Sequence, residues 1–190
     1  MQQTIDPSGP RPTRETLATI ANQALINRLR VGVERFDRRV FNLSDDQLDM
    51  AFLPDAGVGT WPIRVLLGHL ADAELAFIQR LRRVVAEQAP ILQAWDENAF
   101  IDSNLMYGTP ETGPKFPPGA FVATIHTLRQ WTSGWLQTLP PDAFTRIGLH
   151  SERGEETFRT ILEYDVFHLD HHAWYLNRKV FRMLGTAGEQ

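Results

Sequence analysis

The sequence contains no cysteine among its 190 residues, and this absence removes several kinds of chemistry at once. Disulfide bonds, thiolate ligands for a metal and a cysteine nucleophile are all excluded. Positive charge is also in short supply, because 19 Lys and Arg face 23 Asp and Glu and give a formal net charge of −4. A protein that binds nucleic acid usually presents a clustered basic surface, so we expect no nucleic-acid partner.

Long hydrophobic runs are absent too. No apolar stretch reaches the roughly 20 residues that a membrane-spanning helix needs, and the polar residues 1–14 lack the apolar centre of a signal peptide. We therefore expect no membrane partner and a cytoplasmic location. The length suits one domain with one core. We expect a flexible N-terminal segment at 1–14 and a single domain at 15–185.

Four stretches place apolar residues at the three- and four-residue spacing of an amphipathic helix. They cover about residues 15–41, 60–87, 120–139 and 157–184. Ser44 and Gln47 form the pattern of a capping box after the first stretch, and Thr60 is the expected N-cap of the second. Four such helices joined by long connections predict an all-α fold, a four-helix bundle.

Two connections and two tryptophans carry further expectations. The connection 88–119 is long and rich in aromatic residues, so we expect it to pack over a functional region. The link 146–156 contains a turn at Ser151–Gly154 that short strands could flank. In the third helix, Trp131 and Trp135 fall at core spacing and are expected to be buried.

Three histidines form the most informative pattern in the chain. His168 and His172 are one helical turn apart, so they lie on one face, and that face is otherwise apolar. His69 lies at the edge of the apolar face of another helix. If the three converge, they can hold one metal ion and leave a coordination position open, as catalytic sites require. Spacing alone does not prove convergence, and hydrogen-bonded core histidines are the alternative.

Acidic residues beside these histidines suggest supporting roles. Asp165 is one turn before His168 within the apolar face, so it is a candidate for orienting a ligand histidine through its second ring nitrogen. Asp72 is one turn after His69 toward the polar side, where it can act as a general base at a pocket mouth. The alternative for Asp72 is an ordinary surface aspartate.

The other three histidines are less informative. His171 is expected at the flank of its helix, as a surface or pocket-rim residue rather than a ligand. His126 falls opposite the apolar face of its helix and is expected to be solvated. His150 lies in a link, where an ordinary loop histidine is favoured.

The stretch from Trp61 to Glu74, W-P-I-R-V-L-L-G-H-L-A-D-A-E, resembles a segment of the DinB-like family, in particular its YfiT-like branch. The stretch Phe167–His172, F-H-L-D-H-H, is similar to the ligand motif W-H-x-x-H-H of that branch. The segments that begin at Pro90 and Gly148 look like its inter-helix segment and the turn before its last helix. Together these stretches span about residues 55–180.

The resemblance implies a four-helix bundle with one divalent metal, nickel or zinc, bound by His69, His168 and His172. Characterised relatives include bacillithiol S-transferases and a mycothiol-dependent maleylpyruvate isomerase, and many members are described only as metal-dependent hydrolases. A further histidine is common three residues after the pair, where this chain has Tyr175. Tyr175 lies on the site face, so we expect it to contact a bound cofactor or substrate.

The resulting hypothesis is a metal-dependent enzyme that transfers a low-molecular-weight thiol to an electrophilic small molecule. The thiol must be a separate molecule, since the chain has no cysteine. A metal-dependent hydrolase is the first alternative, and a non-catalytic metal-binding stress or interaction protein is the second. Bundles of this kind often pair, so we expect a homodimer.

Overall fold

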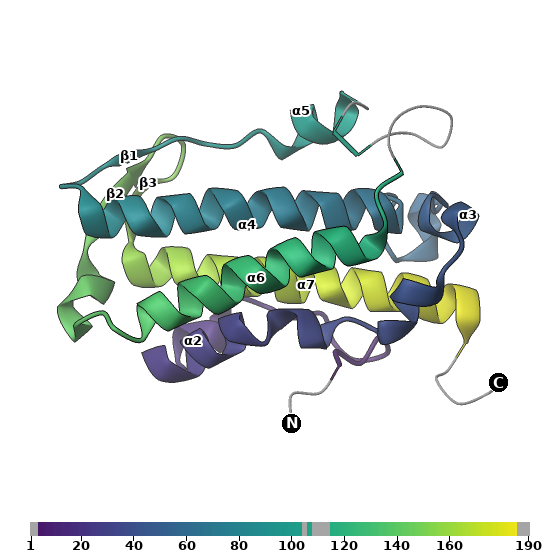
Figure 1. The fold of residues 1–190 in the computed structure, drawn as a ribbon, viewed down its shortest axis with the longest axis horizontal. Coiled ribbons are helices and arrows are strands. Elements are labelled where there is room, and N and C mark those ends of the chain that lie inside the picture. The colour runs from purple at the N-terminus through teal and green to yellow at the C-terminus, as the bar shows by residue number, and fades with distance from the viewer. Residues whose placement is uncertain (1–3, 104–105, 108–114, 186–190) are drawn as a thin grey trace.

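The fold is a bundle of four principal helices, as the sequence predicts (Figure 1). The computed structural model describes residues 4–103, 106–107 and 115–185. The principal helices are α2 (Asn22–Arg30), α4 (Ile63–Ala86), α6 (Pro118–Leu136) and α7 (Phe158–Leu184). Both α2 and α4 contact α6 and α7, so α2 and α4 occupy opposite corners of the bundle. Within the described part of the chain, no helix is long and apolar enough to cross a membrane.

The single helix predicted over 15–41 is wrong, because this region is divided into four short elements. They are α1 (Glu15–Ala18), α2 (Asn22–Arg30) and the 3-10 helices η1 (Gly32–Arg35) and η2 (Arg38–Asn42). The Arg159 side chain donates to the carbonyls of Leu17 and Ile20 at 3.0 and 2.7 Å, where helical amides would otherwise donate. At the second break, a Cβ on Gly32 would lie 2.5 Å from Nη1 of buried Arg129.

The remaining helices begin and end close to the predicted positions. Ser44 and Gln47 form the capping box of α3 (Asp45–Leu48). The N-cap of α4 is Pro62 rather than the predicted Thr60. The helix α7 begins after Thr157, whose side chain accepts the N–H of Thr160. Three shorter elements are η3 (Pro54–Ala56), α5 (Glu97–Asp102) and η4 (Pro141–Thr145).

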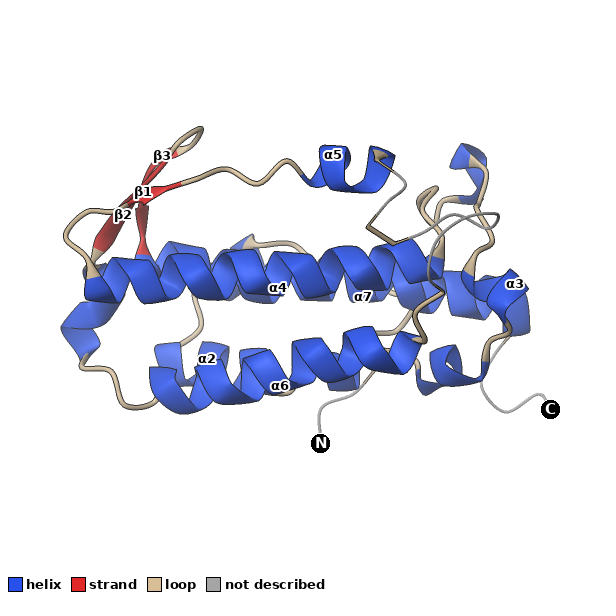
Figure 2. Cartoon of the chain, turned by 45° about the horizontal axis from the view of Figure 1, so that its top comes forward, coloured by secondary structure: helices blue, strands red, loops and turns tan. Residues whose placement is uncertain are grey.

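A small three-stranded sheet lies at one end of the bundle (Figure 2). The strands β2 (Ile147–His150) and β3 (Gly154–Thr157) form an antiparallel hairpin, as the turn signal allowed. The strand β1 (Ile91–Leu92) pairs in parallel with β2, which the sequence did not predict. From β1 the chain runs along α4 to α5, so part of the 88–119 connection covers this helix (Figures 1 and 2). Residues 104–105 and 108–114 of that connection lie outside the described residues.

The two tryptophans of α6 differ in their burial. Trp135 is half-buried and meets the Phe158 ring edge to face, with centroids 6.1 Å apart. The expectation that Trp131 is buried is wrong, because 59% of it is exposed. The Arg82 guanidinium lies 3.8 Å from its ring centroid. A cation can therefore cover an apolar ring that the helical spacing assigned to the core.

The N-terminal segment, expected to be flexible, lies against α7 where it is described. Ile5 is buried, and its carbonyl accepts a hydrogen bond from the Asn177 side chain at 2.8 Å. The indole of Trp174 donates to the carbonyl of Gly9 at 3.0 Å. Residues 1–3 lie outside the described residues, and the predicted domain boundaries stay predictions.

Candidate metal centre

His69, His168 and His172 come together in the interior of the bundle. His69 on α4 is fully buried, and the other two lie one turn apart on α7. The Nε2 atoms of His69 and His168 are 3.0 Å apart, and one ring nitrogen of each histidine lies within 4.8 Å of the others. Two nitrogens bound to one zinc ion at about 2.0–2.1 Å are at most about 4.2 Å apart. The His69–His168 separation therefore suits a shared ion.

Burial sets the protonation of these rings. It lowers the pKa of His69 to about 4, and burial together with the neighbouring histidines lowers the pKa of His168 and His172 well below the usual value. All three imidazoles are therefore neutral near pH 7, and each has a free lone pair. Nδ1 of His69 and Nδ1 of His172 are buried without a hydrogen-bond partner among the described residues. Three neutral, converging imidazoles fit a divalent metal of borderline softness.

Two tryptophans enclose the histidines. The Trp95 ring stacks on His69 at a centroid distance of 5.4 Å, and the Trp61 ring stacks on His172 at 5.9 Å. Neither residue was identified as part of the site from the sequence. Trp61 stood in the segment that resembles the DinB-like family, and Trp95 was one of the aromatic residues that marked the 88–119 connection. Their rings cover part of the surface of the histidine cluster.

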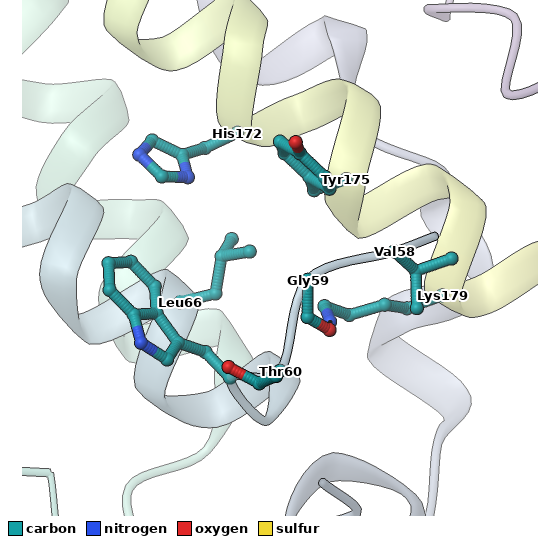
Figure 3. A pocket seen from close by; sticks show the side chains of 8 residues that line it. Val58, Gly59, Thr60, Leu66, His172, Tyr175 and Lys179 are labelled. Atoms are coloured by element: carbon teal, nitrogen blue, oxygen red, sulfur yellow. Dashed lines mark hydrogen bonds between the residues drawn. The ribbon is translucent and has the colours of Figure 1, made fainter. Parts of the chain in front are cut away.

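One cavity opens beside His172. Its volume is about 310 Å³, and six of its lining residues are Val58, Trp61, Leu66, His172, Tyr175 and Lys179 (Figure 3). The walls are mainly apolar. A volume of this order is at the lower end of the range for small-molecule sites.

A second, smaller and more polar cavity, of about 70 Å³, lies beside His168. Its lining includes Ala76, Arg80, Trp95, His150 and Arg153. The three histidines can therefore be approached from two sides that differ in polarity.

Asp165 does not play the predicted role. Its Oδ1 accepts a hydrogen bond from Arg129 at 2.6 Å, and its Oδ2 has no partner among the described residues. The expectation that Asp165 orients a ligand histidine is therefore wrong. Glu74 accepts from the same guanidinium at 2.6 Å, and all three residues are buried. Burial raises the pKa of Glu74 and of Asp165, so this pair retains a proton at a pH where exposed carboxyls have lost theirs.

Asp72 is half-buried and accepts a hydrogen bond from the Tyr107 hydroxyl at 2.6 Å. Burial, and then this bond, raise the pKa of Tyr107. The Tyr107 ring lies so close to α4 that a Cβ on Gly68 would be 2.3 Å from it. Asp72 lines neither of the two cavities beside the histidines. Its position therefore allows an anchoring role as well as the predicted catalytic one.

Tyr175 and His171 lie next to the histidine cluster. Tyr175 lines the larger cavity, and its hydroxyl accepts a hydrogen bond from Arg11 at 3.2 Å. His171 is half-buried between the rings of Phe167 and Tyr175, at centroid distances of 5.4 and 5.1 Å. It is not among the three histidines whose nitrogens converge, which agrees with a place at the pocket rim.

The remaining two histidines have contrasting positions. His126 is exposed, as expected. His150 is only 4% exposed and lines the smaller cavity. The expectation of an ordinary loop histidine is therefore wrong, because His150 belongs to strand β2. Strand β2 places it there, and a β-strand at this position was only weakly signalled by the sequence.

This chain belongs to the DinB superfamily, because the sequence profile of that superfamily matches residues 28–176. YfiT of Bacillus subtilis, named as a candidate metal-dependent hydrolase, is 24% identical over 178 residues, which cover 93% of this chain and 94% of YfiT. A protein of Oceanobacillus iheyensis with the same description is 25% identical over 136 residues, 70% of each chain.

The solved structure of YfiT is similar to this chain in fold. The TM-score is 0.73 at 24% identity, and the match covers 93% of this chain and 95% of YfiT. That structure is described as a four-helix bundle of unusual topology. The likeness confirms the predicted four-helix bundle, and the match to the superfamily profile confirms the predicted DinB-like family.

Proposed function

We propose that this protein is a metal-dependent enzyme whose divalent ion, nickel or zinc, is bound by His69, His168 and His172. The observation that carries the proposal is the convergence of three neutral imidazoles beside two cavities of different polarity. The relatives named as candidate metal-dependent hydrolases support the metal. When bound, such an ion supplies a Lewis acid with an open coordination position.

Between the two enzyme chemistries, we favour transfer of a low-molecular-weight thiol to an electrophilic small molecule. The sulfur forms a bond to an electrophilic carbon, and the leaving group departs with the electron pair of its former bond. The thiol proton must go to a base. The two cavities support a reaction with two partners, and an apolar electrophile suits the larger cavity beside His172. The cavity beside His168 would take only the sulfur end of a polar thiol, whose body would lie in the adjoining polar hollow of about 570 Å³ that shares Trp95 and Arg153 with it.

The chain's own residues have distinct parts in this proposal. Trp61 and Trp95 exclude water from the reacting groups. Tyr175 contacts the molecule in the larger cavity. Asp72 is the proposed base, one turn from His69, and its hydrogen bond from Tyr107 holds the carboxylate in one orientation. Because Asp72 lines neither cavity, the proton would pass to it through one bridging water.

Hydrolysis at the same centre is the alternative, favoured by the names of the relatives. One assay separates the possibilities. The metal-loaded protein is mixed with 1-chloro-2,4-dinitrobenzene and, in turn, bacillithiol, mycothiol and glutathione, and the loss of free thiol is followed. A nitrophenyl ester without thiol tests hydrolysis in parallel.

Thiol-dependent turnover that disappears in His168→Ala supports the transferase. Turnover of the ester alone, lost in the same variant, supports the hydrolase. If both assays show no turnover at full metal occupancy, the enzyme proposal fails and a non-catalytic metal-binding protein remains. The homodimer and the cytoplasmic location stay part of the proposal, and light scattering coupled to size-exclusion chromatography tests the homodimer.

A further inference from the structure

Lys179 is a buried lysine without a carboxylate partner in the described part of the chain. It is only 1% exposed, and it lines the larger cavity together with His172 and Tyr175. Its Nζ donates to the carbonyl of Gly59 at 2.6 Å and lies 4.5 Å from the centroid of the Phe52 ring. An ammonium group has three N–H donors. One carbonyl and one ring face therefore leave Lys179 short of partners.

The hydrogen bond to the Gly59 carbonyl does not explain why a charged residue is buried here, because a neutral donor could make the same bond. Placing an ammonium in an apolar wall without a counter-ion is unfavourable, because the charge loses its hydration. Burial lowers the pKa of Lys179 to about 8, so the side chain is still largely protonated near neutral pH. A cation kept at this position despite the desolvation cost points to an anion that binds there.

The charges around the larger cavity also favour an anion at Lys179. The cavity lining contains no Asp or Glu among the described residues. A second cation, Arg11, donates to the Tyr175 hydroxyl near the same cavity. Figure 3 shows His172, Tyr175 and Lys179 along one side of α7, with Lys179 beside Gly59. His172 and Lys179 are seven residues apart, which is about 10 Å along a helix.

We propose that the larger cavity selects small molecules that carry an anionic group, such as a carboxylate, on an apolar body. Lys179 recognises the anion at one end. Trp61, Leu66 and Tyr175 contact the apolar body, and the opposite end of the molecule lies at His172. Lys179 is therefore a specificity-determining residue. This inference rests on the proposed function, since it gives the substrate class of the same site.

A binding experiment tests the inference without turnover. The probes are 4-phenylbutyrate and its neutral amide, 4-phenylbutyramide, which share one apolar body. Their dissociation constants are measured by isothermal titration calorimetry with the full-length protein as purified. We expect the carboxylate to bind at least about tenfold more tightly, since a charge-assisted hydrogen bond contributes that much.

Three variants locate the origin of this preference. Lys179→Gln keeps a donor for the Gly59 carbonyl and removes the charge, so both probes should bind within about threefold of each other. Lys179→Arg should keep the preference for the carboxylate. The matched control is Arg182→Gln, because exposed Arg182 on the same helix donates to the Ala56 carbonyl but does not line the cavity. It should behave like the parent.

Equal binding of the two probes by the parent, or no binding of either, overturns the proposal even if Lys179→Gln fails to fold. A carboxylate preference that persists in Lys179→Gln also overturns it and indicates that the metal centre holds the carboxylate. The metal content of the same samples is measured separately. A Lys179-dependent preference in a protein that binds no metal would refute the proposed function and leave the anion site standing.

Discussion

The Nε2 atoms of His69 and His168 lie 3.0 Å apart, although 99 positions separate the two residues in the sequence. Contact between α4 and α7 brings them together, and Trp61 and Trp95 cover the resulting cluster. At this distance either the rings share a proton or both present lone pairs to one ion. Burial keeps the rings neutral near pH 7, so each ring can carry its proton on Nδ1 and present the lone pair of Nε2 to a metal.

Asp72→Asn tests whether Asp72 acts as a base. The amide cannot accept a proton at neutral pH, so turnover should fall by at least about tenfold while metal content and helicity are retained. Steady-state kinetics with the thiol and electrophile pair measure this. Turnover within about twofold of the parent would leave Asp72 as an anchor for Tyr107 only.

Tyr107→Phe is the matched control for Asp72. The substitution removes the hydrogen bond to Asp72 but keeps the ring that packs against Gly68. We expect the free energy of unfolding to fall by about 1 kcal/mol, with turnover reduced less than in Asp72→Asn. An equal loss of turnover in both variants would show that the hydrogen bond, rather than the base, is what matters.

His171→Ala should keep the metal. The His171 ring is held between Phe167 and Tyr175 at the rim, and its nitrogens are not among those that converge. We expect unchanged metal stoichiometry and a loss of roughly 1 kcal/mol in stability from the missing ring contacts. Loss of the metal in elemental analysis would mean that His171 is a ligand.

Glu74→Gln tests the buried group formed by Glu74, Arg129 and Asp165. In the folded parent, the raised pKa of Glu74 keeps a proton that the unfolded chain has already lost, so more protons are bound in the folded state. The parent's free energy of unfolding should therefore decrease as pH rises from about 5 to about 8. Gln cannot titrate, so the variant does not share this decrease. Between pH 5 and pH 8 its free energy of unfolding should rise by at least about 1 kcal/mol relative to that of the parent.

Denaturant unfolding at a series of pH values measures the difference between the two proteins. Parallel stability curves for the parent and Glu74→Gln would contradict the raised pKa. Thr127→Ser is a suitable control, since Thr127 is an exposed residue of α6 that does not titrate, and it should leave the slope unchanged.

The sequence could predict the part of the site that depends on the spacing of residues within one helix. His168 and His172 share a face because they are four residues apart on one helix, and helical periodicity placed α7 correctly. The stacking of Trp95 on His69 could not be predicted from the sequence. The position of Trp95 depends on how the segment from β1 to α5 packs along α4. Local patterns carry no information about such packing.

The errors have the same origin. The first helix is interrupted because distant Arg159 takes the carbonyls of Leu17 and Ile20, a contact that periodicity cannot show. Asp165 was assigned to a histidine on the basis of its neighbours on α7. Its actual partner, Arg129, lies on α6, which faces α7 across the bundle.

Elemental analysis of protein purified without an affinity tag or added metal tests the metal centre most directly. The parent should contain about one nickel or zinc ion per chain, and His172→Ala should lose it while circular dichroism shows a largely helical protein, because each ligand histidine is one of only three. Full metal occupancy in His172→Ala would contradict the three-histidine centre.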